Sequence, residues 1–187
     1  MNIIIFGPPG AGKGTQSKIL VDKLNSFQVS TGDMLREEIN NNTEIGKKII
    51  DSMDNGKFVD DEIVNKLLEK VIEDTEKKNK LIFDGYPRTI SQAKNLESLL
   101  SKSNQKIDYI FFLNVKKDSI LKRLEKRKIL EKRSDDDADT ILKRYDTYMN
   151  ITKPVLNFYA SRNNFYEIDG SEKIEVISSK IELILKL

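Results

Sequence analysis

The sequence predicts an α/β fold in which a five-stranded parallel sheet lies between two layers of helices. Short apolar runs rich in β-branched and aromatic residues recur without alternation, as expected of parallel strands buried on both faces. Amphipathic helical periods lie between these runs, and such alternation favours a parallel sheet. A glycine-rich segment follows the first apolar run, where a strand would turn into a helix.

The predicted elements follow from the order of these patterns. The strongest strand signals are Ile3–Phe6, Leu81–Phe83 and Tyr109–Leu113, and the weaker ones are Gln28–Ser30 and Tyr166–Ile168. Two apolar stripes predict helices, one made of Ile63, Val64, Leu67, Leu68, Val71 and Ile72, the other of Ile174, Ile177, Ile181 and Ile184. Helix N-caps are predicted at Asp60 or Asp61 and at Asp118.

Two segments fit the core poorly. Residues 31–59 are helical in pattern but polar, and residues 127–137 (RKILEKRSDDD) are crowded with charge. Insertions after strand ends are where α/β enzymes carry lids. We therefore expect a single domain, 1–187, whose core is 1–29, 60–126 and 138–187, with a small lobe at 30–59 and a short lid at 127–137.

Composition excludes several kinds of chemistry. The chain has no cysteine and no histidine, which excludes disulfides, thiolate catalysis, a histidine base and the usual zinc sites. The net charge of +2 lacks the excess expected of a nucleic-acid binder. No apolar run approaches the ~18 residues of a membrane span, so we expect a cytoplasmic protein. Any metal should prefer oxygen ligands, as Mg²⁺ does.

Gly7–Lys13 almost spells the phosphate-binding P-loop, G-x-x-x-x-G-K-[ST]. Gly14 stands where Ser or Thr belongs, and Thr15 comes one position late. The loop follows a predicted strand and opens a predicted helix, which is the context that such a loop requires. The phosphates of a nucleoside triphosphate are predicted to contact this loop and helix start, at Gly10, Ala11, Gly12, Lys13, Gly14 and Thr15.

Two further motifs follow strand ends. STGDMLR (30–36) places Arg36 one turn into a helix, where it can fork onto a phosphate. DGYPRT (84–89) begins with Asp84, a carboxylate at the end of a buried strand, and such residues commonly organise Mg²⁺ and its waters.

With GPPGAGKGTQ, these motifs make the sequence resemble the adenylate kinase family of nucleoside monophosphate kinases over nearly the whole chain. In that family Arg88's counterpart grips the phosphate of AMP and Gln92's counterpart reads the adenine edge. The resemblance implies AMP contacts at Thr31, Arg36, Lys57, Phe58, Val59, Gly85, Tyr86, Pro87, Arg88, Gln92, Arg133 and Arg144.

Four arginines lie in or beside the charged segment. Arg123 and Arg127 share one face of a predicted helix, while Arg133 and Arg144 flank three aspartates. Arginines spaced in this way commonly belong to a solvated helix face without a role in ligand binding. The resemblance instead implies that the first pair faces ATP, with Glu172 near its adenine, and that the second pair bridges to the acceptor. It also implies a short lid without zinc, a monomer, and a catalytic set of Lys13, Arg88, Arg123, Arg133 and Arg144.

The absence of histidine is consistent with a phosphoryl acceptor that is itself a phosphate group. A phosphate oxygen is already ionised near pH 7, with a second pKa of about 6, so it needs no general base. Lys, Arg, Mg²⁺ and backbone amides then suffice for reversible transfer from ATP to AMP, giving two ADP.

Two alternatives remain open. UMP/CMP kinases of the same fold commonly replace the threonine of STGD and the glutamine after the DG-x-PR block, whereas Thr31 and Gln92 keep the adenylate form. A GTP-binding switch usually carries N-K-x-D, but the nearest stretch here, residues 79–82, has Ile82 in place of the aspartate.

Overall fold

The computed structural model describes residues 1–131 and 138–187, and it contains one five-stranded parallel sheet in the order β2-β3-β1-β4-β5. The central strand is β1 (Ile3–Phe6), flanked by β3 (Leu81–Asp84) and β4 (Tyr109–Asn114). The edge strands are β2 (Phe27–Ser30) and β5 (Phe165–Asp169). All five predicted strands and their parallel arrangement are confirmed.

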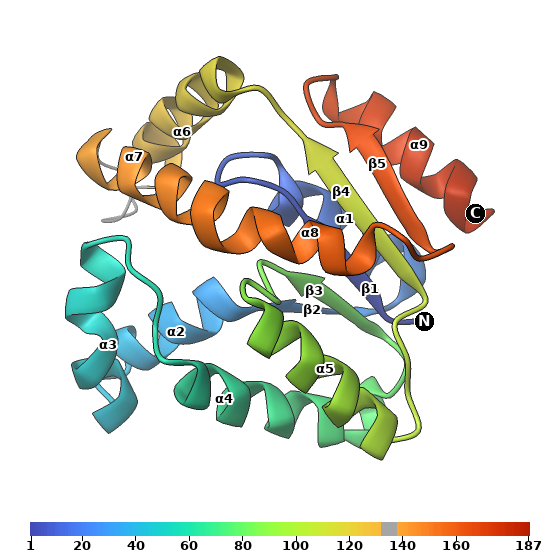
Figure 1. Ribbon diagram of the computed structural model, residues 1–187, viewed down its shortest axis with the longest axis horizontal. Coiled ribbons are helices and arrows are strands. Elements are labelled where there is room, and N and C mark those ends of the chain that lie inside the picture. The colour runs from blue at the N-terminus through green and yellow to red at the C-terminus, as the bar shows by residue number, and fades with distance from the viewer. Residues whose placement is uncertain (132–137) are drawn as a thin grey trace.

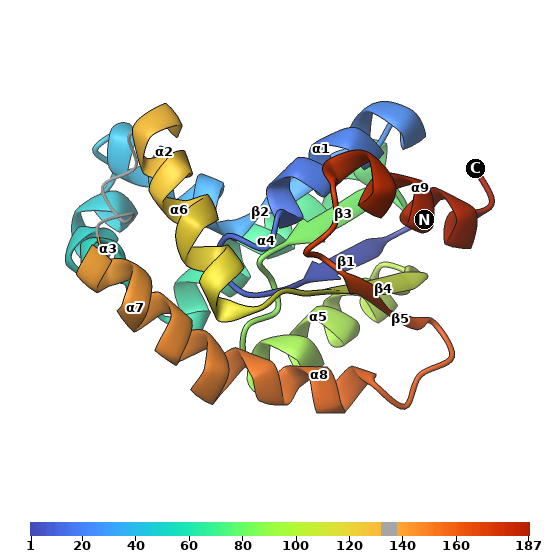
Figure 2. The same cartoon turned by 90° about the horizontal axis from the view of Figure 1, so that it is seen from above.

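Helices cover both faces of the sheet, which makes the three predicted layers (Figure 1). Seen from above, α1 and α9 lie on one face and α5 and α8 on the other (Figure 2). The helices are α1 (Lys13–Leu24), α2 (Thr31–Asn40), α3 (Glu44–Asp54), α4 (Asp61–Glu73), η1 (Thr75–Lys77), α5 (Ile90–Lys102), α6 (Lys117–Glu131), α7 (Ala138–Thr147), the π-helical turn η3 (Tyr148–Thr152), α8 (Lys153–Tyr159) and α9 (Ile174–Leu185).

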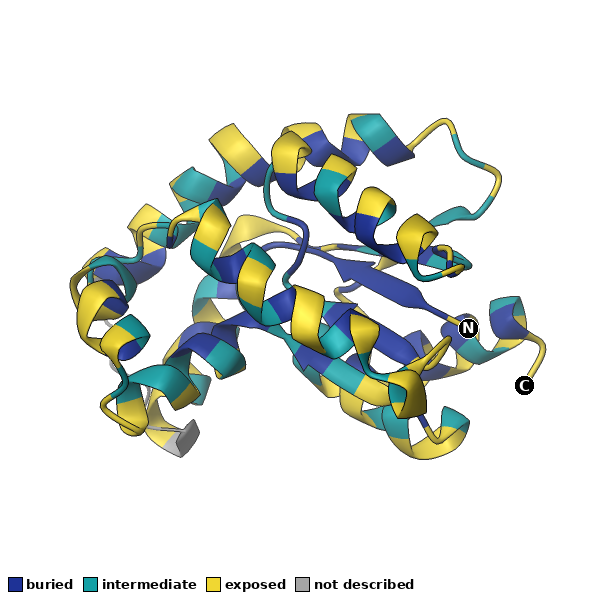
Figure 3. Ribbon diagram, turned by 90° about the horizontal axis from the view of Figure 1, so that it is seen from below, coloured by how far each residue is buried: buried dark blue, intermediate teal, exposed yellow. Residues whose placement is uncertain are grey.

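Two apolar clusters fill the space between the layers. Ile4 of β1 belongs to the cluster beneath α4, α5 and α8, whereas Ile3 and Ile5 belong to the cluster beneath α1, α6 and α9. Successive strand side chains point to opposite faces, so one apolar run serves both clusters. Strand β1 is accordingly buried along its length, and β3 is buried up to the half-buried Asp84 at its end (Figure 3). Among the described residues, no helix combines the length and apolar character needed to cross a bilayer.

The helix boundaries confirm one predicted N-cap and correct another. Asp60 is the N-cap of α4, and its side chain accepts a hydrogen bond from the Glu62 N–H at 2.7 Å. Asp118 is not an N-cap, because α6 starts at Lys117 and the N–H groups of Ser119 and Ile120 both donate to the Lys116 carbonyl. Asp118 lies instead in the first turn, where a carboxylate favours the positive end of the helix dipole.

Helix α6 also continues to Glu131, so residues 127–131 of the predicted lid are helical. These residues, RKILE, have good intrinsic helix propensity, which explains the extension. Residues 132–137 lie outside the described part of the chain.

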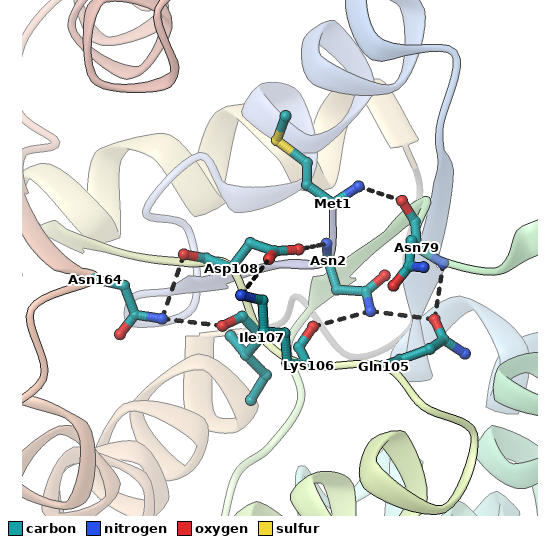
Figure 4. A network of polar contacts seen from close by, with 8 residues as sticks. All are labelled: Met1, Asn2, Asn79, Gln105, Lys106, Ile107, Asp108 and Asn164. Atoms are coloured by element: carbon teal, nitrogen blue, oxygen red, sulfur yellow. Dashed lines mark hydrogen bonds and ion pairs between the residues drawn. The ribbon is translucent and has the colours of Figure 1, made fainter.

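A buried amide organises the amino ends of the strands (Figure 4). Asn2 is fully buried, and its Nδ2 donates to Gln105 Oε1 at 3.2 Å and to the Lys106 carbonyl at 3.0 Å. Its Oδ1 accepts from the Leu81 N–H at 3.1 Å, and its own N–H donates to Asp108 Oδ2 at 2.7 Å. The side chain thereby ties the starts of β1, β3 and β4 together.

Candidate active site

The carboxyl ends of the strands open into a cavity of about 960 Å³. The chain leaves the central strand β1 to one side for β2 and β3, and returns to the other side for β4 and β5. Ligands of open α/β sheets bind where the strand order reverses in this way. The cavity is walled by the loop after β1, the start of α2, residues 56–59, the loop after β3, α6, α7 and the segment before α9.

The loop after β1 presents a helix start to this cavity. Gly12 is the N-cap of α1 at φ +96°, a left-handed conformation that favours glycine. Because glycine has no side chain, it cannot cap the first amide groups of the helix. The first amide groups of α1 and its positive dipole end are therefore suited to an anion. Lys13 Nζ lies over the loop and donates to the carbonyls of Gly7 at 2.9 Å and Pro8 at 3.0 Å.

Positive charge is concentrated around Lys13. The pKa of its ammonium is lowered to about 8, chiefly because the group is buried, while nearby Asp84 acts in the opposite direction. The positive charges of Arg88, Arg144 and Arg127 contribute smaller parts of the same lowering. Arginines from three other segments are thus close enough to repel the Lys13 ammonium, and such a group of cations favours a strongly negative ligand.

Asp84 stands at the end of β3, beside the phosphate loop. Its Oδ2 accepts a hydrogen bond from Gln28 Nε2 at 3.0 Å. A Cβ on Gly14 would lie 3.3 Å from the same oxygen, so the glycine in the Ser/Thr position leaves room for this carboxylate.

The residues around Asp84 fit a magnesium ion. The described residues include no group of three or more His, Cys, Asp or Glu side chains that could enclose a metal. Mg²⁺ seldom needs one, because it keeps several waters and binds through one or two carboxylates together with substrate phosphates. A carboxylate beside a phosphate loop is that kind of donor set.

The opposite wall of the cavity is held by the loop after β3. The Gly85 carbonyl accepts from Thr31 Oγ1 at 3.2 Å and from Arg88 Nε at 2.7 Å, which joins this loop to the start of α2. The Arg88 guanidinium lies 5.5 Å from the ring centre of Phe58, a cation–π arrangement that restricts it. On α2, Arg36 forms an ion pair with Asp33 at 2.5 Å, so a phosphate bound there would compete with a carboxylate.

The arginines of α6 and α7 close a third side. Arg123 Nη1 donates to the Ala11 carbonyl at 3.3 Å, which connects α6 to the phosphate loop. Helix α7 meets the turn after α3: a Cβ on Gly56 would lie 3.0 Å from Arg144 Cγ, and Thr140 Oγ1 lies 3.5 Å from the Asp54 carbonyl oxygen. The segment 30–59 and the helix that carries Arg144 therefore touch across the cavity.

The structure brings almost all of the predicted site residues to this one cavity. Arg133 is the exception, because it lies outside the described residues. The predicted residues that line the cavity are Gly10, Ala11, Gly12, Lys13, Gly14, Thr15, Thr31, Arg36, Lys57, Phe58, Val59, Asp84, Gly85, Tyr86, Pro87, Arg88, Gln92, Arg123, Arg127, Arg144 and Glu172. Their shared location is a finding, whereas their individual roles remain predictions.

Sequence reasoning missed two residues that contact this set. Gln28 holds Asp84, and Asp61 accepts a hydrogen bond from Gln92. Gln28 gave only a weak signal, because it lies on the partly exposed edge strand β2, where a polar side chain is common. Asp61 gave no such signal, since an aspartate in the first turn of a helix is common.

Comparison with known proteins gives a consistent result. A family model described as adenylate kinase matches residues 5–164. A protein named adenylate kinase from Pelagibacter ubique is 46% identical over 213 aligned positions, which cover 100% of both chains. Proteins of the same name from Hyphomonas neptunium and Mycoplasma mycoides are 42% and 39% identical, and the alignments cover all of this chain and 98% and 100% of theirs.

Proposed function

The chain belongs to the adenylate kinase family, and from this premise we propose that it catalyses the reversible transfer of a phosphoryl group from ATP to AMP, giving two ADP. One observation carries the proposal: a phosphate loop, an acceptor motif and arginines from separate segments line a single cavity. A reaction between two polyphosphate ligands needs both to lie in one site of positive charge.

ATP is the ligand of the phosphate loop. The amides of residues 10–15 and the dipole of α1 hold its phosphates, and Lys13 moves from the loop carbonyls onto them. Arg123 and Arg127 approach from α6, and Glu172 lies at the adenine end of the cavity.

AMP occupies the wall formed by α2, residues 57–59 and the loop after β3. Arg36 and Arg88 bind its phosphate in fork geometry, and Thr31 and Gln92 lie on the side of its base. Lys57, Phe58, Val59, Gly85, Tyr86 and Pro87 complete the contact surface.

The chemistry is mainly positioning and charge stabilisation. An oxygen of AMP attacks the γ-phosphorus of ATP in line, and ADP leaves with the electrons of the broken P–O bond. Lys13, Arg88, Arg123, Arg133 and Arg144 are the residues assigned to balance the charge of the transferred group. The lobe at 30–59 and the lid at 127–137 exclude water, which would otherwise accept the phosphoryl group.

Mg²⁺ is the proposed metal, and Asp84 is the residue that would hold it through bound water. When bound with ATP it supplies positive charge on the phosphate oxygens. Gln28 donates a hydrogen bond to the Asp84 carboxylate, and Gly14 leaves room for it beside the loop. The absence of cysteine and histidine from the whole sequence leaves no usual ligands for a structural zinc.

We further propose a monomer that acts in the cytoplasm, without nucleic-acid or membrane partners. Sedimentation of the purified protein tests the first point, with a single species near 21.5 kDa expected.

A coupled assay with ATP, Mg²⁺ and each of AMP, CMP, UMP and GMP tests the function. We expect AMP to be converted fastest, with two ADP formed for each AMP consumed. Faster conversion of CMP or UMP would support a pyrimidine kinase instead. Binding of ATP without conversion of any acceptor would overturn the enzymatic proposal.

A further inference from the structure

We propose that Asp61 is a specificity-determining residue, which positions the Gln92 amide so that the acceptor site selects a 6-aminopurine over a 6-oxopurine. The inference rests on the proposed function, because it assigns the acceptor base to the wall on which Gln92 lies. It adds a residue that does not itself line the cavity among the described residues.

Asp61 connects two helices at the back of this wall. It is the first residue of α4, directly after the Asp60 N-cap. Its Oδ1 accepts from Gln92 Nε2 at 2.5 Å, and its Oδ2 lies 3.3 Å from the Thr89 hydroxyl, which can donate to it. Thr89 is the N-cap of α5 and accepts from the Gln92 N–H at 3.1 Å. Both oxygens of Asp61 are thus directed at the start of α5.

The other side of the Gln92 amide meets a donor. Its Oε1 accepts from the Arg88 backbone N–H at 2.7 Å. A backbone N–H can only donate and an ionised carboxylate can only accept, so the two neighbours require the same orientation of the amide. A flipped amide would place NH₂ against an N–H and oxygen against a carboxylate. Gln92 is 3% exposed, so water cannot relieve either conflict.

A fixed amide has a chemical preference. After these two bonds, Gln92 keeps one N–H and one oxygen lone pair to offer a base. Adenine presents an amino donor at C6 and an acceptor at N1, and a glutamine amide can match both. Hypoxanthine presents the reverse, an oxygen at C6 and an N–H at N1. If the Gln92 amide cannot flip, buried polar groups are left unpaired when a 6-oxopurine binds.

The test compares Asp61→Asn with Asp60→Asn. Asparagine offers either an oxygen or an N–H to Gln92, so the first variant removes the fixed acceptor with little change of shape. The control alters the neighbouring residue, whose oxygen accepts from the Glu62 N–H and which asparagine replaces well as an N-cap. Binding of AMP and of inosine monophosphate is measured by calorimetry, and turnover of both is measured separately.

We expect Asp61→Asn to lower the preference for AMP over inosine monophosphate by about tenfold or more, a change of ~1.4 kcal/mol. AMP binding should weaken while that of inosine monophosphate holds or improves, and Asp60→Asn should keep the wild-type ratio. Equal weakening of both nucleotides, or no change, would overturn the proposal. A wild-type protein that binds neither AMP nor inosine monophosphate would also overturn it. Turnover is the separate readout: a wild-type protein that binds AMP selectively without converting it defeats the proposed function alone.

A second measurement needs no variant. In wild-type protein without nucleotide, one Gln92 side-chain amide proton should exchange slowly with solvent in NMR spectra, because Asp61 accepts it in a buried place. Fast exchange of both protons would contradict a fixed amide.

Discussion

The two ends of the same sheet treat polar groups in opposite ways. At the amino ends of the strands, Asn2, Gln105 and Asp108 bond to one another and to strand backbones, and Asn164 Nδ2 donates to the Ile107 carbonyl at 3.0 Å (Figure 4). At the carboxyl ends, the pKa of Lys13 is lowered first by burial and then by three nearby arginines.

This difference separates stability from ligand binding within one small domain. Amides that satisfy one another inside the protein stabilise the fold, because each buried donor finds an acceptor. Like charges gathered around a cavity cost folding free energy, and an anionic ligand can offset that cost. Substitutions at the two ends should therefore have opposite signatures.

The largest effect is expected from Lys13→Met. The variant keeps an unbranched stem of similar length but removes the ammonium above the phosphate loop. Loss of one such charge from a phosphoryl-transfer site should lower kcat/KM by about 10³-fold or more. Steady-state kinetics measure it, with Lys23→Met on the same helix as control, since Lys23 pairs with Glu182 instead. A loss below tenfold would contradict the assignment.

Arg88→Lys should give the next largest effect. Lysine keeps the charge but loses the planar fork and its fit against Phe58, so we expect kcat/KM for AMP to fall by about 10²-fold. Arg162→Lys is the matched control, because Arg162 pairs with Glu97 away from the cavity-lining residues. Wild-type kinetics for AMP in both variants would contradict the assignment of Arg88 to the phosphate of AMP.

At the other end of the sheet, Asn2→Ala should reduce stability and spare activity. It removes partners from the Leu81 N–H and the Lys106 carbonyl, and unsatisfied buried groups should lower the free energy of unfolding by about 2–4 kcal/mol. Denaturant unfolding measures this change, with the exposed Asn114→Ala as control. A fall in kcat/KM of tenfold in the folded variant would show that the two ends are coupled.

The smallest effect is a pH dependence of stability. The folded-state pKa of Lys13, about 8, lies below its ordinary value of 10.5, so the charged lysine opposes folding below pH 8. Between pH 8 and 10.5 the folded protein releases this proton first, and its stability rises relative to a variant without the amine. Lys13→Met should be more stable than wild type at pH 7 by at most about 3 kcal/mol, since the residue keeps some exposure.

Unfolding curves at pH 7 and pH 10 check this sign. The advantage of Lys13→Met should shrink at the higher pH. An advantage that grows with pH would contradict the direction of the pKa shift.

The strands that the sequence predicted most clearly are the central ones. The central strands β1, β3 and β4 are buried on both faces and gave clear apolar runs, whereas the edge strands β2 and β5 gave weak ones because they stay partly exposed. Phe27, on edge strand β2, is 38% exposed. The phosphate loop and acceptor motifs were found because their spacing along the chain is itself the signal.

What the sequence could not predict depends on contacts between distant segments. Gln28 meets Asp84 and Asp61 meets Gln92 only after strands and helices have packed, and neither pair has a fixed spacing. The N-cap at Asp118 was wrong because the chain had already turned helical at Lys117. Local propensity places a helix start only to within a residue or two.

The most direct test of the account is the stabilisation that ATP gives to wild type, Asn2→Ala and Lys13→Met. A ligand that binds the folded state raises the free energy of unfolding according to its concentration and affinity, whatever the starting stability. At one saturating ATP concentration, without AMP, wild type and Asn2→Ala should gain equal amounts, and Lys13→Met should gain far less. An equal gain in Lys13→Met would show that the cation group at the carboxyl end does not hold the phosphates.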